Sequence, residues 1–363
     1  MNYPFKNLVF EGGGIKGIGY VGALEYLEND KKILSNIQRF GGTSAGAITA
    51  LILGLGYSVK DLTEKLKKVQ FEKFKDDDGI IIDTFRLLVG GYGRYKGDEF
   101  LKWIKEDIIK PKMVEWAQKG IIKEEMKDKD LTFEEIVKIT GKEIYFQGTN
   151  VSTRQVVTFS HETTPDMPVA EAVRISISIP FFFEPIVWKG EYFVDGGVLN
   201  NYPVRLFDQK KYVLDEKHYE VTSYYERAAE FLETISAERV SANLEDVQVY
   251  NKETLGFRLD SKVEIDVMRN IAAPVSHEID NFFDFTWNLM GTIVKGQDSM
   301  HLHKDDTVRT IYINTVGVTA IDFNISEEKQ LELIASGKQA AEEFFQTYDD
   351  PNNQSINKVI PSV

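Results

Sequence analysis

Short apolar runs and helical apolar patterns alternate near the N-terminus of the chain. Residues 7–10 form an apolar run that predicts a buried strand, and residues 37–40 predict a second short strand. Between them, apolar residues recur at the spacing of one helix face, at Tyr20, Val21, Leu24 and Leu27. Residues 45–53 are apolar on all sides, which indicates a helix buried in a core. Two successive strand–loop–helix units predict parallel strands whose following loops meet at one edge of a sheet.

The rest of the chain predicts further helices and a return to strands. Ser58 with Asp61, and Thr132 with Glu135, have the spacing of helix N-terminal caps. A helix is expected to end at Pro111, and its apolar face carries Phe100, Leu101, Ile104 and Ile108. Further predicted elements are strands at 143–147, 155–159, 191–194 and 309–314, helices at 168–174, 212–239 and 280–294, and a last helix opening at Ser326. The aromatic helix at 280–294 is expected to pack in the core, with a lipid-facing surface as the alternative.

Composition limits the classes of partner. The chain has 363 residues, 42% of them hydrophobic, and a formal net charge of −14. This charge argues against a nucleic-acid partner, which calls for a basic face. The chain has no cysteine, so disulfides, thiolate nucleophiles and cysteine metal sites are excluded.

Domain organisation and location follow from what the chain lacks. We find no internal repeat or linker, and expect a single domain over residues 1–346 followed by a flexible tail at 347–363. The start of the chain does not resemble a signal peptide, and the most apolar helix is too short to span a bilayer. These features predict a cytoplasmic protein, with peripheral membrane contact or non-classical export left open.

The sequence Gly42-Thr43-Ser44-Ala45-Gly46 lies where a predicted strand passes into a helix. Gly-x-Ser-x-Gly in this setting is typical of a nucleophile elbow, which raises the serine at a sharp turn. Glycine on each side permits the turn, and the helix N-terminus points amides toward the hydroxyl. An N-capping serine in a glycine-rich turn is the structural alternative. The strand and helix favour Ser44 as a nucleophile.

A glycine-rich loop follows the first predicted strand, with Gly12, Gly13, Gly14, Lys16 and Gly17. Three of its glycines fit the dinucleotide fingerprint Gly-x-Gly-x-x-Gly, which requires a second strand ending in an acidic residue. Here the second strand ends at Ser44 instead, so the loop is predicted to form an oxyanion hole beside that serine. Lys16 either adds positive charge there or is a solvated lysine, and both interpretations remain open.

Asp195-Gly196-Gly197 follows the predicted strand at 191–194. An aspartate in this position could cap a turn or act in catalysis, and capping is favoured when the residue is considered alone.

Upstream of Asp195, Phe181, Phe182 and Phe183 follow a proline and predict either core packing or the wall of an acyl-chain pocket. The apolar, glycine-punctuated residues 79–96 predict a lid.

A serine nucleophile needs a base, and histidine is the usual one. The chain has five histidines: His161, His218, His277, His301 and His303. None lies in a glycine-rich or strand-end context, although His161 follows a strand and could approach a site. His301 and His303 lie near two aspartates, where a solvated loop is favoured over a metal site. A carboxylate could serve as the base if burial raised its pKa from about 4.

Taken together, the segments 12–17, 42–46 and 195–197 resemble, in this order, the motifs of the patatin-like phospholipase family. Tyr95-Lys96-Gly97-Asp98, residues 176–183 and Asn200-Asn201-Tyr202-Pro203 are also similar to that family. The resemblance is dense over residues 8–204 and looser over 307–345. It implies an α/β protein with a three-layer α/β/α fold, in which a mostly parallel central sheet carries helical insertions. The core would span 5–204, with a C-terminal strand and helix at 307–346.

The resemblance also implies a site and an activity. Ser44 would be the nucleophile and Asp195 the base, with the amides of Gly13 and Gly14 as the oxyanion hole and Lys16 beside it. We therefore expect a lipid acyl hydrolase with no cofactor and no metal, acting on a phospholipid or other fatty-acyl ester. It would work through an acyl-enzyme, with transient contact to a membrane surface. The alternatives are a Ser–His–Asp hydrolase, a nucleotide-binding protein using the glycine loop, and a lipid-binding module with a vestigial site.

Overall fold

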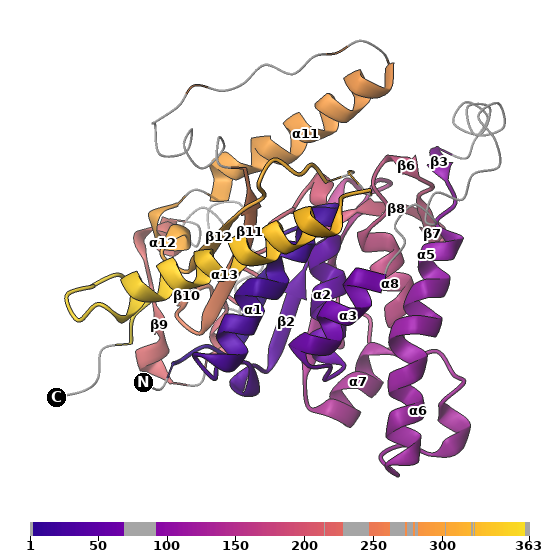
Figure 1. Cartoon of the computed structure of the whole chain (residues 1–363), viewed down its shortest axis with the longest axis horizontal. Helices are drawn as coiled ribbons and strands as arrows, with labels where there is room; N and C mark the ends of the chain where they lie inside the picture. Colours follow the sequence, from indigo (N-terminus) through magenta and orange to yellow (C-terminus); the bar gives the residue numbers. More distant parts are fainter. Residues whose placement is uncertain are drawn as a thin grey trace, which may run out of the picture.

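A computed structural model of the chain describes residues 3–68, 92–213, 215–227, 247–261, 273, 279, 282–301, 303–320, 322 and 324–359 (Figure 1). The main sheet is formed by β1 (Asn7–Phe10), β2 (Arg39–Gly42), β4 (Glu143–Asn150), β5 (Gln155–Phe159), β7 (Ile186–Trp188), β8 (Glu191–Asp195), β11 (Thr254–Asp260) and β12 (Thr310–Asn314). Two small sheets pair β3 (Gly93–Tyr95) with β6 (Phe181–Phe183), and β9 (Tyr219–Glu220) with β10 (Tyr250–Asn251).

The described helices lie mainly between these strands in the sequence. They are α1 (Gly19–Asn29), α2 (Ala45–Gly54), α3 (Val59–Lys68), α5 (Asp98–Trp103), α6 (Lys110–Gln118), α7 (Phe133–Thr140), α8 (Val169–Ser176), α11 (Phe282–His301), α12 (Lys304–Thr307) and α13 (Glu327–Asp349). In the described part of the chain, no helix is both long enough and apolar enough to cross a membrane.

The strand order of the main sheet is β12-β11-β1-β2-β4-β8-β7, with β5 also paired to β4. Its first five strands are parallel, whereas β5, β7 and β8 run antiparallel to their neighbours. The expected α/β fold with a mostly parallel central sheet is therefore confirmed. Because β1, β2 and β11 are parallel, the loops that follow them meet at one edge of the sheet.

The two faces of the sheet bury different side chains of the same strands. In β1, Leu8 and Phe10 belong to a large core that also contains residues of α1, α2 and α13. Val9 points to the opposite face and packs with Phe207 and Tyr212. The segment carrying Phe207 is fixed by Asp208, whose carboxylate lies 2.7 Å from the fully buried guanidinium of Arg309.

Helices α1 and α13 lie side by side across one face of the sheet (Figure 1). Glycines permit this close contact. A Cβ atom on Gly22 would lie 1.8 Å from the carbonyl oxygen of Ile334, and one on Gly337 would lie 1.9 Å from that of Gly19. The backbones of the two helices therefore touch where side chains would normally separate them.

Several local predictions are confirmed. Thr132 and Glu135 form a reciprocal capping box at the start of α7, and Ser58 and Asp61 bond reciprocally at the start of α3.

The second strand lies two residues later than predicted, at Arg39–Gly42. The helix expected to end at Pro111 instead continues through a π-helical turn, Ile104–Ile109, into α6. That prediction was wrong because the π-helical turn just before Pro111 changes the backbone hydrogen-bond pattern, so the proline is accommodated without ending the helix.

Two other expectations are corrected in part, and a third falls mostly outside the described residues. Residues 212–239 were expected to be mostly helical. Residues 223–227 are helical, whereas the described residues before them form 3-10 turns and the short strand β9, and residues 214 and 228–239 lie outside the described residues. The tail was expected to be flexible from residue 347, but α13 continues to Asp349 and Asn357 is 1% exposed. The side chain of Asn357 donates a hydrogen bond to the carbonyl of Val308, so a long-range contact holds this polar segment. Residues 69–91, which include most of the expected lid at 79–96, lie outside the described residues.

We predict that Gly337→Ala destabilises the protein by about 1–3 kcal/mol, because the new methyl group meets the backbone of α1. Gly291→Ala in α11 is the matched control, since a Cβ atom there has no neighbour within 4 Å. Alanine at that exposed helical position should be neutral or stabilise by about 0.5–1 kcal/mol. Urea unfolding measures both variants, and equal stability of the two would contradict the close helix contact.

Candidate active site

Ser44 lies between β2 and α2 in a backbone conformation that side chains rarely adopt, with φ 53° and ψ −122°. Glycines make the turn feasible. A Cβ atom on Gly42 would lie 2.4 Å from the carbonyl carbon of Gly46, and one on Gly46 would lie 2.4 Å from the carbonyl oxygen of Phe10. The amide of Ser44 donates to the Ser176 hydroxyl at 3.0 Å. The turn is therefore strained and held from several sides, as a nucleophile elbow is.

Strand register brings Asp195 level with Ser44. Gly42 pairs with Phe146 of β4, and Asp195 pairs with Gly148, two residues further along the same strand. Ser44 is likewise two residues beyond Gly42, so the two side chains reach the same height on either side of β4. The Ser44 hydroxyl lies close enough to the Asp195 carboxyl group to lower its pKa. The structure thus brings together the two residues that were predicted to be catalytic.

The carboxyl group of Asp195 is almost fully buried, with 5% of the residue exposed. Burial raises the pKa of Asp195 to about 7, because the ionised form loses its hydration. The hydrogen bond from the Gly197 amide, at 2.7 Å, and the nearby Ser44 hydroxyl both oppose this rise. The carboxyl group can therefore take up and release a proton near neutral pH.

The glycine loop lies against Ser44. A Cβ atom on Gly12 would be 3.2 Å from that of Ser44, and one on Gly17 would be 3.1 Å from that of Ala45. Gly14 has a φ of 56° and packs under the carbonyl of Ala320. In the described part of the chain, the amides of Gly13 and Gly14 have no hydrogen-bond acceptor. They are therefore available to an oxygen atom placed above the loop.

Two of the predicted loop residues are already engaged. The amide of Gly12 donates to the carbonyl of Asn201 at 3.0 Å. The ammonium group of Lys16 lies 3.3 Å from the carbonyl oxygen of Leu259 and donates to it. Lys16 thus lies over Gly13 with its charge held by the backbone of β11.

Polar residues that the sequence did not single out join the glycine loop to the aspartate turn. The side-chain amide of Asn201 donates to Glu11 Oε1 and to the carbonyl of Gly12, each at 3.2 Å. The other oxygen of Glu11 accepts the amide of Leu259 at 2.6 Å. Asn201 belongs to the family-like segment at 200–203, which was a usable signal. Glu11 carried none, because a lone glutamate beside a glycine run does not indicate what it will contact.

The three consecutive phenylalanines have different environments. Phe181 is 44% exposed, whereas Phe183 is 5% exposed and packs under the guanidinium of Arg174 at 5.2 Å. Phe182 lies between them, edge-on to Tyr95 with ring centroids 4.9 Å apart. Phe183 is therefore core, and a contribution of Phe181 and Phe182 to an acyl pocket stays a prediction.

The histidines with described side chains lie away from Ser44. Ser44 and Asp195 are at the carboxyl edge of the parallel strands. His161 instead neighbours Glu143, the first residue of β4, while His218 bonds Glu253 just before β11. His303 caps α12, which precedes β12. His277 and the side chain of His301 lie outside the described residues.

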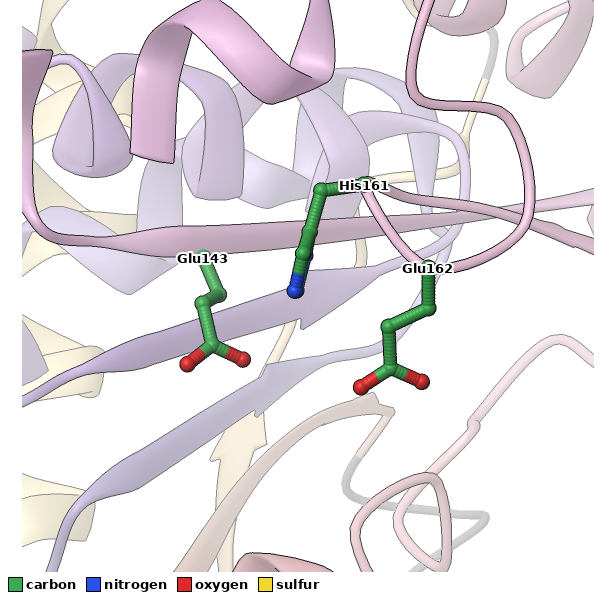
Figure 2. A group of neighbouring side chains, drawn as sticks. All are labelled: Glu143, His161 and Glu162. Carbon is green, nitrogen blue, oxygen red and sulfur yellow. The ribbon is translucent and has the colours of Figure 1, made fainter. Parts of the chain in front are cut away.

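His161 forms a cluster with Glu143 and Glu162, in which the imidazole ring extends between the two carboxyl groups (Figure 2). One possible ligand atom from each residue lies within 4.8 Å of the others, a spacing that suits a metal ion. Both carboxylates already have cationic partners, however, Arg39 at 3.1 Å and Lys211 at 2.6 Å. The charges of this group balance without a metal, and we interpret it as a network of ion pairs.

An α/β sheet with a strained serine at a strand–helix turn is typical of hydrolases that have a nucleophile elbow. Comparison with known sequences identifies the family. The model of the patatin-like phospholipase family matches residues 8–208, so the chain belongs to that family. The resemblance noted in the sequence is confirmed.

Individual relatives extend this assignment. An uncharacterized protein of Bacillus subtilis, YqhO, is 28% identical over 94% of this chain and 98% of its own length. A probable lipid hydrolase of Invertebrate iridescent virus 6, 463L, is 30% identical over 55% of this chain and 62% of its own. Among solved structures, VipD from Legionella pneumophila superposes with a TM-score of 0.58 at 17% identity, covering 94% of this chain and 67% of VipD. That similarity concerns the fold alone.

We predict that Asp195→Asn makes the protein more stable, by an amount that depends on pH. Because the folded pKa of about 7 exceeds the ordinary value of 3.8, ionisation of Asp195 weakens the native state as pH rises through that window. The advantage of the variant should grow from pH 4 to pH 7 and reach about 4 kcal/mol at most. Urea unfolding between pH 4 and pH 8 measures it, with Asp166→Asn at an exposed position as the control. A difference in the free energy of unfolding that stays constant from pH 4 to pH 8 would contradict a buried carboxyl group with a raised pKa.

Proposed function

We propose that this protein hydrolyses fatty-acyl esters of lipids, with Ser44 as nucleophile and Asp195 as general base. The observation that supports it best is the Ser44 hydroxyl beside a buried carboxyl group whose pKa is raised to about 7. A base works best when its pKa is close to the working pH, because it must both accept and return a proton. An exposed aspartate, with a pKa near 4, would be a poor partner for a serine hydroxyl.

In the first step, the Ser44 oxygen attacks the carbonyl carbon of the ester while its proton passes to Asp195. The tetrahedral intermediate collapses, the ester C–O bond breaks, and Asp195 returns the proton to the departing alcohol. In the second step, water attacks the acyl-Ser44 ester and gives its proton to Asp195. Collapse of this intermediate returns a proton to the Ser44 oxygen and releases the fatty acid.

Both intermediates carry a negative oxygen that needs hydrogen-bond donors. The amides of Gly13 and Gly14 are suitable because they have no acceptor among the described residues and belong to a loop that lies against Ser44. Amides fixed in advance stabilise developing charge without reorganising. The position of Lys16 over Gly13 supports an added electrostatic contribution from its ammonium group.

Family membership supports a lipid as the substrate, and so does the similarity to a viral protein named as a probable lipid hydrolase. Two alternatives receive less support. A Ser–His–Asp mechanism would need a histidine at the carboxyl edge of the sheet, and the three described histidines lie near its amino edge. Dinucleotide binding would need a second strand that ends in an acidic residue, but β2 leads into Ser44 instead.

We predict that Ser44→Ala abolishes ester hydrolysis while the protein remains folded, since a small side chain replaces the hydroxyl. Asp195→Asn should lose at least about a hundredfold in rate, the usual scale for a lost general base. Release of p-nitrophenol from p-nitrophenyl butyrate measures both, and a fluorophosphonate should label wild type but not Ser44→Ala. Unchanged turnover by folded Ser44→Ala protein would refute the mechanism. A single histidine-to-alanine variant as inactive as Ser44→Ala would indicate a triad.

We further predict that catalytic efficiency rises with acyl-chain length until the binding site is filled. Each buried methylene contributes about 0.8 kcal/mol, close to fourfold in kcat/KM. A series of p-nitrophenyl esters from acetate to palmitate measures this on wild type and on Phe182→Ser. Preference for acetate with no gain at longer chains would leave a small-ester hydrolase. A steep gain that Phe182→Ser does not alter would place the acyl chain elsewhere.

A further inference from the structure

Helix α11 meets the rest of the protein at the turn that follows Asp195, the 3-10 turn Gly196–Val198. In Figure 1 it lies at the edge of the molecule, apart from the layer formed by α1 and α13. The described apolar side chains Phe285, Leu289 and Ile293 are between 40% and 53% exposed. Gln297, by contrast, is 6% exposed. Among the described side chains of this helix, the buried one is therefore polar, which requires an explanation.

The shortest hydrogen bonds of the Gln297 amide group go to this turn and to Asn201 just after it. Its nitrogen donates to the carbonyl of Gly197 at 2.9 Å and to that of Val198 at 2.8 Å. Its oxygen accepts the backbone amide of Asn201 at 3.0 Å. A buried glutamine with two donors and an acceptor engaged on one backbone segment fixes that segment against rotation.

Two of the residues that Gln297 contacts are themselves hydrogen-bonded to Asp195 or to the glycine loop. Gly197 is the residue whose amide donates to the Asp195 carboxylate at 2.7 Å. Asn201 accepts the amide of Gly12 on its own carbonyl, at 3.0 Å, and its side chain donates to the Gly12 carbonyl at 3.2 Å. Gly197 thus connects Gln297 to the proposed base, Asp195. Asn201 connects Gln297 to the glycine loop.

We propose that Gln297 is a positioning residue that holds the Asp195 turn and the glycine loop in register for ester hydrolysis. This inference rests on the proposed function of Ser44 and Asp195. Gln297 does not touch the reacting atoms. It acts through the backbone of Gly197 and Asn201, so its loss should reduce the rate of the chemical step more than the binding of substrate.

The chemistry of the amide group is specific. A glutamate at position 297 can accept from Asn201 but cannot donate, and it would place a negative charge against the carbonyl oxygens of Gly197 and Val198. A methionine has a similar length and can neither donate nor accept well. Both substitutions should therefore release the turn. Thr292→Ala is the matched control, because that exposed hydroxyl donates to the carbonyl of Asn288 in its own helix and to no other described residue.

The test measures kcat and KM for p-nitrophenyl butyrate with full-length wild type, Gln297→Met, Gln297→Glu and Thr292→Ala. Rates are referred to the fraction of protein that a fluorophosphonate labels, so that misfolded protein does not count. We expect kcat to fall about 10- to 100-fold in both Gln297 variants, with KM changed by less than about threefold. Thr292→Ala should behave as wild type.

A pH profile of kcat/KM separates positioning from simple loss of stability. The ionisable groups bordering this network are Asp195 after β8, Glu11 after β1 and Lys16 in the glycine loop. Asp195 is hydrogen-bonded to the Gly197 amide, which lowers its pKa, so a weakened bond should shift the acidic limb of the profile above that of wild type.

The outcomes are distinguishable. Gln297 variants with wild-type kcat and the same acidic limb would overturn the positioning role while hydrolysis by wild type still stood. A loss of rate explained entirely by a smaller labelled fraction, with an unshifted limb, would make Gln297 a structural residue only and would also overturn it. Failure of wild type to hydrolyse the ester, or hydrolysis by Ser44→Ala, would refute the proposed function itself.

Discussion

The site depends on the contact between the first turn of α2 and the end of β1. Gly46 lies against the carbonyl of Phe10, and Gly42 lies against Gly46, with no room for a side chain at either position. This contact forces Ser44 into its strained backbone conformation and directs it toward the edge of the sheet. The glycine loop can then lie beside Ser44, because β1 and β2 are adjacent and parallel. Close packing of these two backbone segments thus creates the position of the proposed nucleophile.

A second constraint is the burial of Asp195. Burial raises its pKa to about 7, which suits the proposed base and weakens the folded state when the group ionises. The Gly197 amide limits this cost, and Gln297 holds the turn to which that amide belongs. The same burial therefore gives Asp195 a pKa suited to the proposed base and lowers the stability of the folded state.

Much of this arrangement could be predicted from local sequence. The glycines around Ser44, the glycine loop after the first strand and the aspartate before two glycines each restrict the backbone locally, so their patterns are informative. The capping boxes at Ser58 and Thr132 were predictable for the same reason. The helix through Pro111 was not, because a π-helical turn depends on packing around the whole segment.

By itself, the sequence determined the parallel α/β order, the strand–turn–helix at Ser44 and the two residues proposed for catalysis. Tertiary structure alone decided that Ser44 and Asp195 stand level across β4, since register depends on pairing between strands distant in the chain. It also decided that Asn201, Glu11 and Gln297 join the two loops. A glutamine in a helix 100 residues beyond Gly197 has no local pattern that reveals its partner, because hydrogen bonds between distant segments form only when the chain is folded.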